Sequence, residues 1–573
     1  MKASDYIAQV LADQGIEHVF EVSGGMIAHL LDSLHRQRRV RIWSMRHEQA
    51  AAFACDAIGR LKGLASVAMA TSGPGATNLL TGIGSCFFDS SPALFITGQV
   101  NRSELKGDRK VRQLGFQETD IVSIASPITK AAWQVVNVDQ LPGMIAHAMV
   151  TAKSGRPGPV LLDIPMDIQR EELTPAALPV TTTSCKDSTS QASVDTCLST
   201  LRSASRPMVL AGGGIRAGNA IQRFREFIET RKLPVVHSLL GVDVLPSTSK
   251  YRIGMIGTYG NRWANLALSR CDALLVLGSR LDIRQTGSDT QAFKRERTIF
   301  HVDIEDGEMN NRVTGCTPIH SDVGSFLDSC LSTEIKPYRE EHADWFSELT
   351  ISRQVWPDDR EQNLITGINP NRFMNRLSTV SREACAFVVD VGQHQMWAAQ
   401  SICLGESQRF LTSGGMGAMG FALPAAIGAS VSSNGTPVVV VAGDGGFQIN
   451  IQELETIAHH QLPVKIVVIN NGCHGMVRQF QESYFEGRYG STFAGYSAPD
   501  FANVANAYGI PGRTCSEEKD VESSLQWLWN HPGRPALLQV MIEMKLNAYP
   551  KVAFGRSLAE MEPYSRPIDI EST

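Results

Sequence analysis

Residues 438–471 of the chain, VVVVAGDGGFQINIQELETIAHHQLPVKIVVINN, contain two short apolar runs joined by a segment of about one helix. The first run ends at Gly443-Asp444-Gly445-Gly446 and the second ends at Asn470-Asn471. Two such runs predict a strand–helix–strand unit with parallel strands and a right-handed crossover. Asp444 and Asn471 would then lie at the carboxyl ends of two strands, where α/β sheets bind their ligands. An acid and an amide there, with glycines between them, suit a small divalent cation that also holds a diphosphate.

The composition describes a globular protein with several domains. A chain of 573 residues is too long for one hydrophobic core, so about three domains are expected. The net charge of −5 argues against general nucleic-acid binding, and no apolar run approaches the roughly 20 residues of a membrane span. The eleven cysteines are scattered without a CxxC pair, and the amino terminus lacks the apolar core of a signal peptide. Together these features indicate a reduced, cytoplasmic protein.

Strand and helix patterns alternate through three parts of the chain, which predicts an α/β protein with three doubly wound parallel sheets. The predicted domains cover residues 1–175, 190–340 and 365–550, and residues 551–573 form a carboxyl-terminal tail, either a flexible lid or a frayed end. The Ser/Thr/Pro-rich sequence between residues 171 and 206 predicts a linker. In the first domain, residues 71–78 (TSGPGATN) either offer backbone amides to an anion or form only a tight turn.

In the central domain, several predicted strands end in a glycine or an acid, at Gly212-Gly213-Gly214, Gly278, Asp303 and Asp322. This pattern is typical of dinucleotide-binding folds, in which an acid binds a ribose hydroxyl. The domain has no GxGxxG motif, so a purely structural role is the alternative. We favour cofactor binding, because a structural domain would carry fewer strand ends of this kind.

Longer strings resemble one enzyme family. Gly443-Asp444-Gly445, followed after 24 residues by Asn470-Asn471, resembles the metal–diphosphate signature of thiamine diphosphate enzymes. Nearly the whole chain resembles the acetolactate (acetohydroxyacid) synthases, through RHEQ (46–49), ATSGPGATNL (70–79), ITGQV (96–100), FQET (116–119), SGRPGPVLLDIP (154–165), VGQHQMWAAQ (391–400), GAMGFALPAAIGA (417–429), INIQELETIAHHQLPVK (449–465) and GMVRQ (475–479). The resemblance implies a pyrimidine-binding, a central FAD-binding and a diphosphate-binding domain, with Mg²⁺, thiamine diphosphate and FAD as cofactors.

The same resemblance implies which residues bind these cofactors. Asp444, Asn471 and the backbone carbonyl of Cys473 are expected to bind Mg²⁺. The residues expected at the organic cofactors are Gln393, His394, Gly417, Met419, Gly445, Gly446 and Met476 for thiamine diphosphate, and Gly213, Gly214, Gly278, Arg280, Asp282, Asp303 and Asp322 for FAD. In this family the flavin is largely structural, so FAD would not imply a redox reaction.

The resemblance also implies the catalytic residues and the reaction. Glu48 would hydrogen-bond the pyrimidine ring, because a buried acid there favours the tautomer that removes a proton from the thiazolium carbon. The alternative interpretation of Glu48 is an ordinary surface acid beside His47. Phe116 and Gln117 would lie near the reacting carbonyl, and a structural amide is the alternative for Gln117. The implied reaction decarboxylates pyruvate and adds the two-carbon unit to a second 2-keto acid, which gives acetolactate.

Four features depart from the family pattern on the acceptor side. Phe480 replaces a tryptophan, Met166 replaces a lysine, and Asn101 replaces a proline. The segment 101–115 is several residues longer than expected and holds five basic residues, Arg109 and Arg112 among them, against two acids. One interpretation is a solvated charged loop. The other is a site for an anionic acceptor such as a nucleotide-linked ketosugar, as in the yersiniose-type branch of the family.

Other functions remain as alternatives. Pyruvate oxidases share the three cofactors but pass electrons through FAD, and simple decarboxylases carry a catalytic His pair. The adjacent pair His459-His460 lies on the predicted crossover helix, away from the strand ends, and is expected to be structural. A binding or scaffold protein would have lost Glu48 or Asp444, and both are present. The family's sites form between subunits, so a homodimer or homotetramer with small-molecule substrates is implied, while a regulatory subunit is left open.

Overall fold

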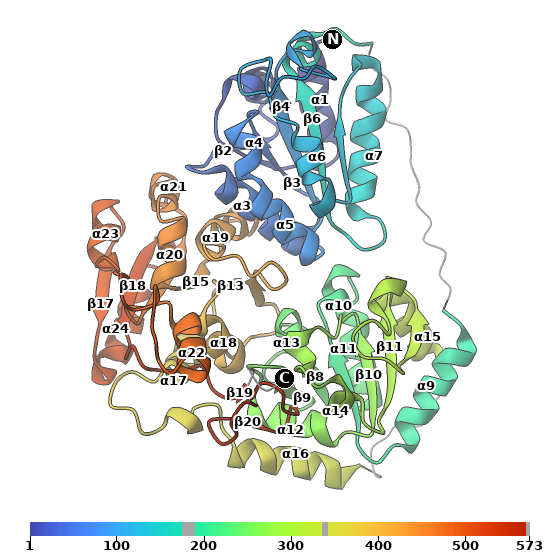
Figure 1. The fold of residues 1–573 in the computed structure, drawn as a ribbon, viewed down its shortest axis with the longest axis vertical. Helices are drawn as coiled ribbons and strands as arrows, with labels where there is room; N and C mark the ends of the chain where they lie inside the picture. The colour runs from blue at the N-terminus through green and yellow to red at the C-terminus, as the bar shows by residue number, and fades with distance from the viewer. Residues whose placement is uncertain (175–188, 335–341, 569–573) are drawn as a thin grey trace.

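The computed structural model describes residues 1–174, 189–334 and 342–568, which form three α/β units (Figure 1). The first unit is built on a six-stranded parallel sheet of order β2-β1-β3-β4-β6-β5. Its strands are β1 (His18–Glu21), β2 (Arg41–Ser44), β3 (Ser66–Ala70), β4 (Ala93–Gln99), β5 (Ala131–Gln134) and β6 (Pro159–Pro165). Its main helices are α1 (Ala3–Asp13), α2 (Ala28–Gln37), α3 (Glu48–Lys62), α5 (Leu80–Phe88), α7 (Leu141–Lys153) and α8 (Met166–Arg170).

The third unit repeats this strand order, with a six-stranded sheet β14-β13-β15-β16-β18-β17 that is also parallel. The strands are β13 (Ala386–Val389), β14 (Arg409–Thr412), β15 (Val438–Gly443), β16 (Val464–Asn470), β17 (Gly512–Cys515) and β18 (Ala536–Met541). The main helices are α17 (Pro370–Val380), α18 (Gln393–Ser401), α19 (Ala422–Ser432), α20 (Asp444–Ile449), α21 (Glu453–His460), α22 (Gly475–Tyr484), α23 (Phe501–Ala507) and α24 (Val521–Leu528). In both sheets the strands follow the chain-order pattern 2-1-3-4-6-5.

The central unit has a different order, β9-β8-β7-β10-β11-β12, which in chain order is 3-2-1-4-5-6. Its strands are β7 (Pro207–Ala211), β8 (Val235–His237), β9 (Arg252–Met255), β10 (Ala273–Leu277), β11 (Thr298–Asp303) and β12 (Thr317–His320), and its main helices are α9 (Gln191–Ser203), α11 (Ile221–Arg231), α12 (Arg262–Arg270), α15 (Val323–Ser332) and α16 (Ala343–Val355). This is the order of dinucleotide-binding sheets, whose ligand crevice lies where the order reverses, here between β7 and β10. The predicted fold class, three doubly wound parallel sheets, is confirmed.

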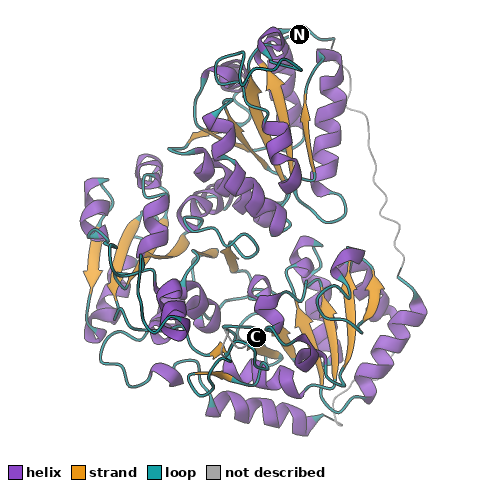
Figure 2. Ribbon diagram, viewed as in Figure 1, coloured by secondary structure: helices purple, strands orange, loops and turns teal. Residues whose placement is uncertain are grey.

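The first and third units meet through α3 and α19, which share one alanine-rich core. A side chain at Gly428 would collide with the backbone of Ala54, so the two helices approach at backbone distance. The Phe421 ring, just before α19, packs against Phe53 with centroids 5.3 Å apart and lies under Arg60, near the end of α3, at 5.3 Å. The strand arrows of the two sheets point in opposite directions, so the two carboxyl edges face opposite directions (Figure 2).

The start of the carboxyl-terminal tail packs on the central unit. Strand β19 (Lys551–Val552) pairs antiparallel with β20 (Met561–Glu562), and the Val552 amide donates to the Thr258 carbonyl at 2.7 Å. Val552 and Met561 are buried in the central core, so this stretch is neither a free lid nor a frayed end. Residues 569–573, and residues 175–188 of the predicted linker, lie outside the described residues. None of the helices described in residues 1–174, 189–334 and 342–568 has the length and apolar character of a membrane span.

Candidate functional site

Asp444 and Asn471 lie side by side at the carboxyl edge of the third sheet. Asp444 directly follows β15 and Asn471 directly follows β16, and these two strands pair in parallel with Gly443 opposite Ile469. The pattern of two apolar runs is therefore observed as the strand–helix–strand unit that it predicts. Asn471 accepts the amide hydrogen of Cys473 at 3.3 Å, which folds the chain after β16 back toward this edge.

The Asp444 carboxyl group is buried and only partly satisfied. It is 3% exposed, and burial raises its pKa to about 6. The Tyr496 hydroxyl donates to it, but its Oδ2 atom has no hydrogen-bond partner among the described residues. A buried polar atom without a partner is costly, so one left open at the carboxyl edge of a sheet is expected to receive a ligand.

Two side chains from the start of α18 face the same edge. Gln393 accepts from the Asn471 side-chain amide at 3.3 Å and donates to Gln479 at 3.1 Å. His394 is buried, which lowers its pKa to about 3, so the ring is neutral at physiological pH. Its Nε2 atom has no partner among the described residues. The strand order of the third sheet reverses between β13 and β15. Nε2 of His394, which follows β13, is thus a second polar atom without a partner at this crevice.

The glycines of residues 443–446 leave no room for side chains. A Cβ at Gly443 would lie 2.8 Å from Nδ1 of His394, and one at Gly445 would lie 2.7 Å from the His474 ring. One at Gly446 would lie 2.7 Å from Oδ1 of Asp390. Only glycine allows the backbone to approach these groups so closely, and such glycines also expose backbone amides to an anion.

Residues 413–420, between β14 and α19, carry Gly417 and Met419. Gly417 has a φ of +63°, a conformation that favours glycine. Met419 reaches the Gly445 region, since its methyl carbon would lie 3.4 Å from a Cβ placed there. The buried Asp390 accepts from the amides of Gly420 at 3.0 Å and Ala422 at 2.9 Å and thereby fixes the end of the loop. Met476 lies half-buried in the first turn of α22 and packs against the core of the third unit.

Glu48 is the first residue of α3, at the carboxyl edge of the first sheet. Its Oε2 atom accepts from the Asn78 side chain at 2.9 Å, and its Oε1 atom lies against Gly75, so residues 71–78 support it. Gln49, the next residue along α3, accepts from the Asn450 side chain at 3.1 Å, and Asn450 also donates to the Gly420 carbonyl at 2.8 Å, so the start of α3 lies near the end of the loop of residues 413–420. Among the described residues, however, no hydrogen bond joins Glu48 to Asp444 or Asn471 within one chain.

The FQET string forms an exposed turn beside this edge. Phe116 is 79% exposed. Gln117 has a φ of +65°, and its backbone packs against Gly73, where a Cβ would lie 3.1 Å from the Gln117 carbonyl oxygen. A non-glycine residue at positive φ is strained, and such strain is concentrated at functional sites. Glu118 accepts from the amides of Lys106 at 2.6 Å and Leu114 at 2.8 Å and so braces the long loop before it.

The basic residues of the long loop differ in their contacts. Arg102 pairs with Asp167 at 2.7 Å and with Glu171, so it anchors the loop to α8. Arg109 turns back to donate to the Leu105 carbonyl at 2.9 Å. Arg112 is exposed and forms no ion pair or hydrogen bond among the described residues, and the same holds for the Lys110 side chain. The positive charge that faces solvent is therefore smaller than the sequence alone suggests.

The three other acceptor-side positions lie in two units. Asn101 follows β4 and accepts from Arg170 at 2.9 Å, and Met166 follows the adjacent strand β6. Phe480 lies on α22 of the third unit, 45% exposed, with its ring 4.6 Å from that of Tyr484. Figure 1 shows α22 on the far side of the molecule from the upper edge of the first unit, so one chain does not join these positions.

The central unit holds an open cavity at the point where its strand order reverses, with about 1210 Å³ of empty space when the solvent at its mouth is included. Every residue that the sequence assigns to the flavin site lines it: Gly213, Gly214, Gly278, Arg280, Asp282, Asp303 and Asp322. The loops after β7 and β10 cross here, where the Gly214 amide donates to the Gly278 carbonyl at 2.9 Å. Two of the acids also cap helices, since Asp282 accepts from the Arg284 amide and Asp322 from the Gly324 amide, both at 2.8 Å.

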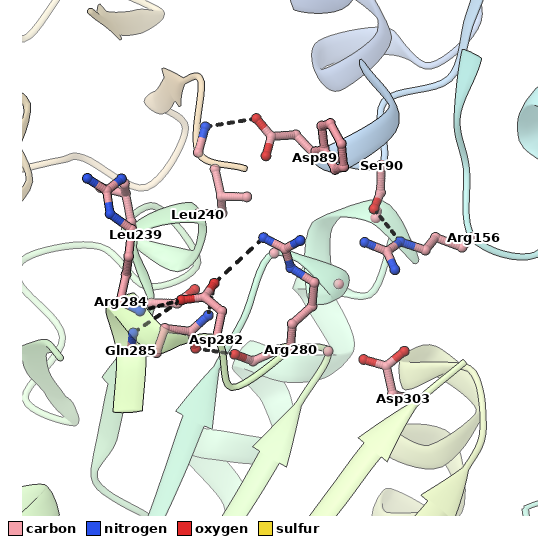
Figure 3. A pocket seen from close by; sticks show the side chains of 18 of the residues that line it. Asp89, Ser90, Arg156, Leu239, Leu240, Arg280, Asp282, Arg284, Gln285 and Asp303 are labelled. Carbon is pink, nitrogen blue, oxygen red and sulfur yellow. Dashed lines mark hydrogen bonds and ion pairs between the residues drawn. The ribbon is translucent and has the colours of Figure 1, made fainter. Parts of the chain in front are cut away.

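Sequence reasoning missed the part of the cavity that the other two units supply. Figure 3 shows Asp89, Ser90 and Arg156 of the first unit opposite Arg280 and Asp303 of the central unit. Arg156 donates to Ser90 at 2.8 Å and to Glu308 at 2.7 Å, so it joins the two units. Gly414 completes the wall from the third unit. Only Arg156 had a signal, as part of the SGRPGPVLLDIP string.

Comparison with protein-family models finds three matches in chain order. Residues 1–124 match the N-terminal TPP binding domain of thiamine pyrophosphate enzymes, residues 194–330 match the central domain, and residues 390–540 match the C-terminal TPP binding domain. Each match lies within one of the three sheets' units.

Curated relatives align over nearly the whole chain. The acetolactate synthase isozyme 2 large subunit of Escherichia coli (strain K12) is 37% identical, over 98% of this chain and 99% of its own length. The acetolactate synthase large subunit of Pyropia yezoensis is 36% identical, over 96% and 94%. That of Lactococcus lactis subsp. lactis (strain IL1403) is 34% identical, over 97% and 95%.

Proposed function

Because the chain belongs to the acetolactate synthase family of thiamine pyrophosphate enzymes, we propose that it decarboxylates pyruvate and adds the two-carbon unit to a second carbonyl compound. With a second pyruvate as acceptor the product is acetolactate, which makes the protein a thiamine-diphosphate-dependent transferase. The observation that carries this proposal is the carboxyl edge of the third sheet, where Asp444 keeps a buried carboxylate oxygen open beside a neutral His394.

The residues at this edge fit Mg²⁺ and a diphosphate. The open Oδ2 of Asp444 and the oxygen of Asn471 are hard ligands of the kind that Mg²⁺ prefers, and the Cys473 carbonyl would add a third. Gln393, His394 and the amides of Gly445 and Gly446 would hold the diphosphate, with Gly417, Met419 and Met476 along the rest of the cofactor. Bound thiamine diphosphate supplies the electron sink for the decarboxylation and for the carbon–carbon bond.

The catalytic role falls to Glu48. Its carboxyl group would hold the proton at the pyrimidine ring, and Asn78 and the loop of residues 71–78 fix its position. Phe116 and Gln117 would orient the reacting carbonyl and exclude water when the exposed turn is covered. Because Glu48 has no hydrogen bond to Asp444 or Asn471 within the described part of one chain, and the carboxyl edges of the two sheets face opposite directions, we assign the complete site to two subunits of a homodimer or homotetramer.

The central cavity fits FAD. Its crossed glycine loops and its acids at the end of β11 and before α15 suit a dinucleotide. Gly213, Gly214, Gly278 and Arg280 would lie along its phosphates, with the acids at the ribose hydroxyls. The described cysteines carry no disulfide, which is in keeping with a cytoplasmic enzyme.

The product formed from pyruvate tests the proposal. Protein supplied with Mg²⁺, thiamine diphosphate, FAD and carbon-13-labelled pyruvate is expected to release CO₂ and form labelled acetolactate, detected by nuclear magnetic resonance. Oxygen uptake or flavin bleaching by pyruvate, without a new carbon–carbon bond, would show a pyruvate oxidase instead. No turnover with any keto acid would refute the enzyme proposal.

A second candidate is transfer of the two-carbon unit to a nucleotide-linked ketosugar. The observation that favours it is the long loop of residues 101–115, in which Arg112 faces solvent beside the strand ends that carry Asn101 and Met166. Guanidinium groups suit the diphosphate of such an acceptor, and Phe480 in place of tryptophan would widen the pocket.

Enzyme mixed with pyruvate and a CDP-linked 4-ketosugar is expected, on this second proposal, to give a branched sugar. The double variant Arg109→Ala/Arg112→Ala should lose that product and keep acetolactate formation. If wild-type enzyme gives only acetolactate, and the double variant gives it at an undiminished rate, the ketosugar proposal fails.

A further inference from the structure

The loop of residues 413–420 lies between the two candidate cofactor sites. At its start, Gly414 lines the central cavity. Toward its end it carries Gly417 and Met419, and the Met419 methyl carbon lies at Gly445 of the diphosphate edge. Ser413 closes the loop internally by accepting from the Ala418 amide at 3.1 Å. This short, internally bonded loop gives a contiguous physical connection between the two sites.

Asp89 of the first unit holds the start of this loop. Its Oδ2 atom accepts from the Gly414 amide at 2.9 Å, and its Oδ1 atom accepts from the Gly415 amide at 2.6 Å. The side chain is fully enclosed and is neutralised by Arg60 at 3.0 Å. Figure 3 shows it at the upper wall of the cavity, directed at the backbone nitrogen of the loop.

The same stretch of loop is wedged by a side chain of the central unit. Leu240 lies between Gly213, which follows β7, and Gly414. A Cβ placed at Gly414 would lie 2.9 Å from the Leu240 side chain, and one placed at Gly213 would lie 3.1 Å from it. Beside Asp89, Ser90 accepts from Arg156, which also pairs with Glu308. Cavity-lining residues on both sides thus determine where Gly414 and Gly415 lie.

The far end of the loop is held by a second buried acid. Asp390 accepts from the Gly420 amide at 3.0 Å and lies against Gly446, one of the glycines of the diphosphate edge. Asp390 itself has all its buried bonds within the third unit. The loop therefore has one anchor at the flavin cavity, in another unit, and one anchor at the diphosphate edge.

We propose that Asp89 is a positioning residue that couples the two cofactor sites, so that filling the central cavity with a flavin dinucleotide raises the affinity for thiamine diphosphate. A dinucleotide packed against Leu240 and against Gly414, whose amide Asp89 holds, would select one position of the loop, and that position presents Gly417 and Met419 to the second cofactor. By thermodynamic reciprocity, thiamine diphosphate raises the affinity for the flavin by the same factor. This inference rests on the proposed function.

Linkage between the two binding equilibria tests the proposal without any assay of turnover. Thiamine diphosphate is titrated calorimetrically, at fixed Mg²⁺, into flavin-free and into FAD-loaded protein. Wild-type protein is expected to bind it at least about fivefold more tightly when FAD is bound, the lower end of typical coupling. Flavin fluorescence titrations, with and without thiamine diphosphate, should give the same factor. Asp89→Asn, which places an amide N–H against a donor, should reduce it below about twofold.

Matched variants separate coupling from general damage. Asp56→Asn also disturbs the Arg60 ion pair, at 2.7 Å, but Asp56 has no bond to residues 413–420, so this variant should keep the factor. Leu240→Ala, which removes the wedge, should reduce it and serves as the test if Asp89→Asn does not fold. A wild-type factor below about twofold, or an undiminished factor in the two loop variants, overturns the inference. Absence of thiamine diphosphate binding to wild-type protein would instead refute the proposed function.

Discussion

Asp163, at the carboxyl end of β6 in the first sheet, and Asp444, after β15 in the third, are both buried, and burial raises the pKa of each to about 6. Their surroundings differ. Asp163 accepts from Thr97 at 2.7 Å, Gln99 at 3.1 Å and Gln134 at 2.9 Å, so both of its oxygens are satisfied. Asp444 keeps its Oδ2 atom without a partner among the described residues. Two sheets with the same strand order thus hold a buried acid in two ways: one acid is satisfied within the fold, and the other keeps an oxygen open, which we propose for a ligand.

The loops around these two acids also differ in how open they are to a ligand. Around Asp444, glycines and buried rings already form a cradle. Beside Asp163, Gln99 also donates to the Thr119 carbonyl at 2.8 Å, so that acid supports the FQET turn, whose Phe116 remains 79% exposed. On the proposed function, the third sheet would carry the preformed half of the site, and the first sheet would carry the half that a second subunit covers.

The largest expected effect is on catalysis at the first sheet. Glu48→Gln should lower the rate of CO₂ release from pyruvate by about 10²- to 10⁴-fold, because proton transfer by a positioned acid contributes about that much. Its Asn78 contact can persist, so thiamine diphosphate affinity measured by calorimetry should change little. Glu17→Gln, at an exposed acid of the same unit, is the control. Retained turnover in Glu48→Gln would sink the mechanism.

A binding effect is expected at the third sheet. Asp444→Asn should weaken Mg²⁺-dependent binding of thiamine diphosphate by about 100-fold, since loss of even a supporting group costs about 10- to 100-fold at metal sites. Asp163→Asn changes a buried acid of equal pKa in the first sheet and should leave this affinity unchanged. Titration calorimetry measures both affinities. An equal loss of thiamine diphosphate affinity in the two variants would show that the two buried acids do not differ in function.

Asp163 should instead control stability as a function of pH. Its native pKa of about 6 lies above its ordinary value of 3.8, so the native state binds a proton that the unfolded state releases between these pH values. Wild-type stability relative to Asp163→Asn should therefore fall as pH rises from 5 to 7.5, by about 1.4 kcal/mol. Thermal unfolding of both proteins at the two pH values measures this. A constant difference between them would show that Asp163 is not titrated there.

The smallest expected effect is at the exposed loop of the first sheet. Arg112→Ala should raise KM for a CDP-linked 4-ketosugar about two- to fivefold, in line with the strength of exposed ion pairs, and leave acetolactate formation unchanged. Arg202→Ala, on α9 of the central unit, is the matched control. An unchanged KM for the ketosugar would show that the loop is a solvated charged surface and does not bind the acceptor.

The fold and the third-sheet part of the candidate site could be predicted from the sequence, because the patterns that indicate them are local in the chain. Apolar runs that end in glycine or acid place Asp444, Asn471 and Asp303 at strand ends, and the structure has them there. Asp89 and Asp163 gave no such signal, because their partners lie in distant segments that only tertiary packing brings together. The packing of residues 551–568 on the central unit was missed for the same reason, since a Pro- and charge-containing stretch resembles a loose end.

We propose that Glu48 of one chain and Asp444 of another build one site for pyruvate. Mixing Glu48→Gln and Asp444→Asn proteins under conditions of subunit exchange tests this proposal, with acetolactate formation as the readout. Each inactive variant alone should stay inactive. A mixed dimer holds one intact site and one site with both changes, so the equimolar mixture is expected to regain about a quarter of wild-type activity, from statistical pairing of symmetric subunits. No recovery, in a mixture shown to contain mixed dimers, would contradict the claim.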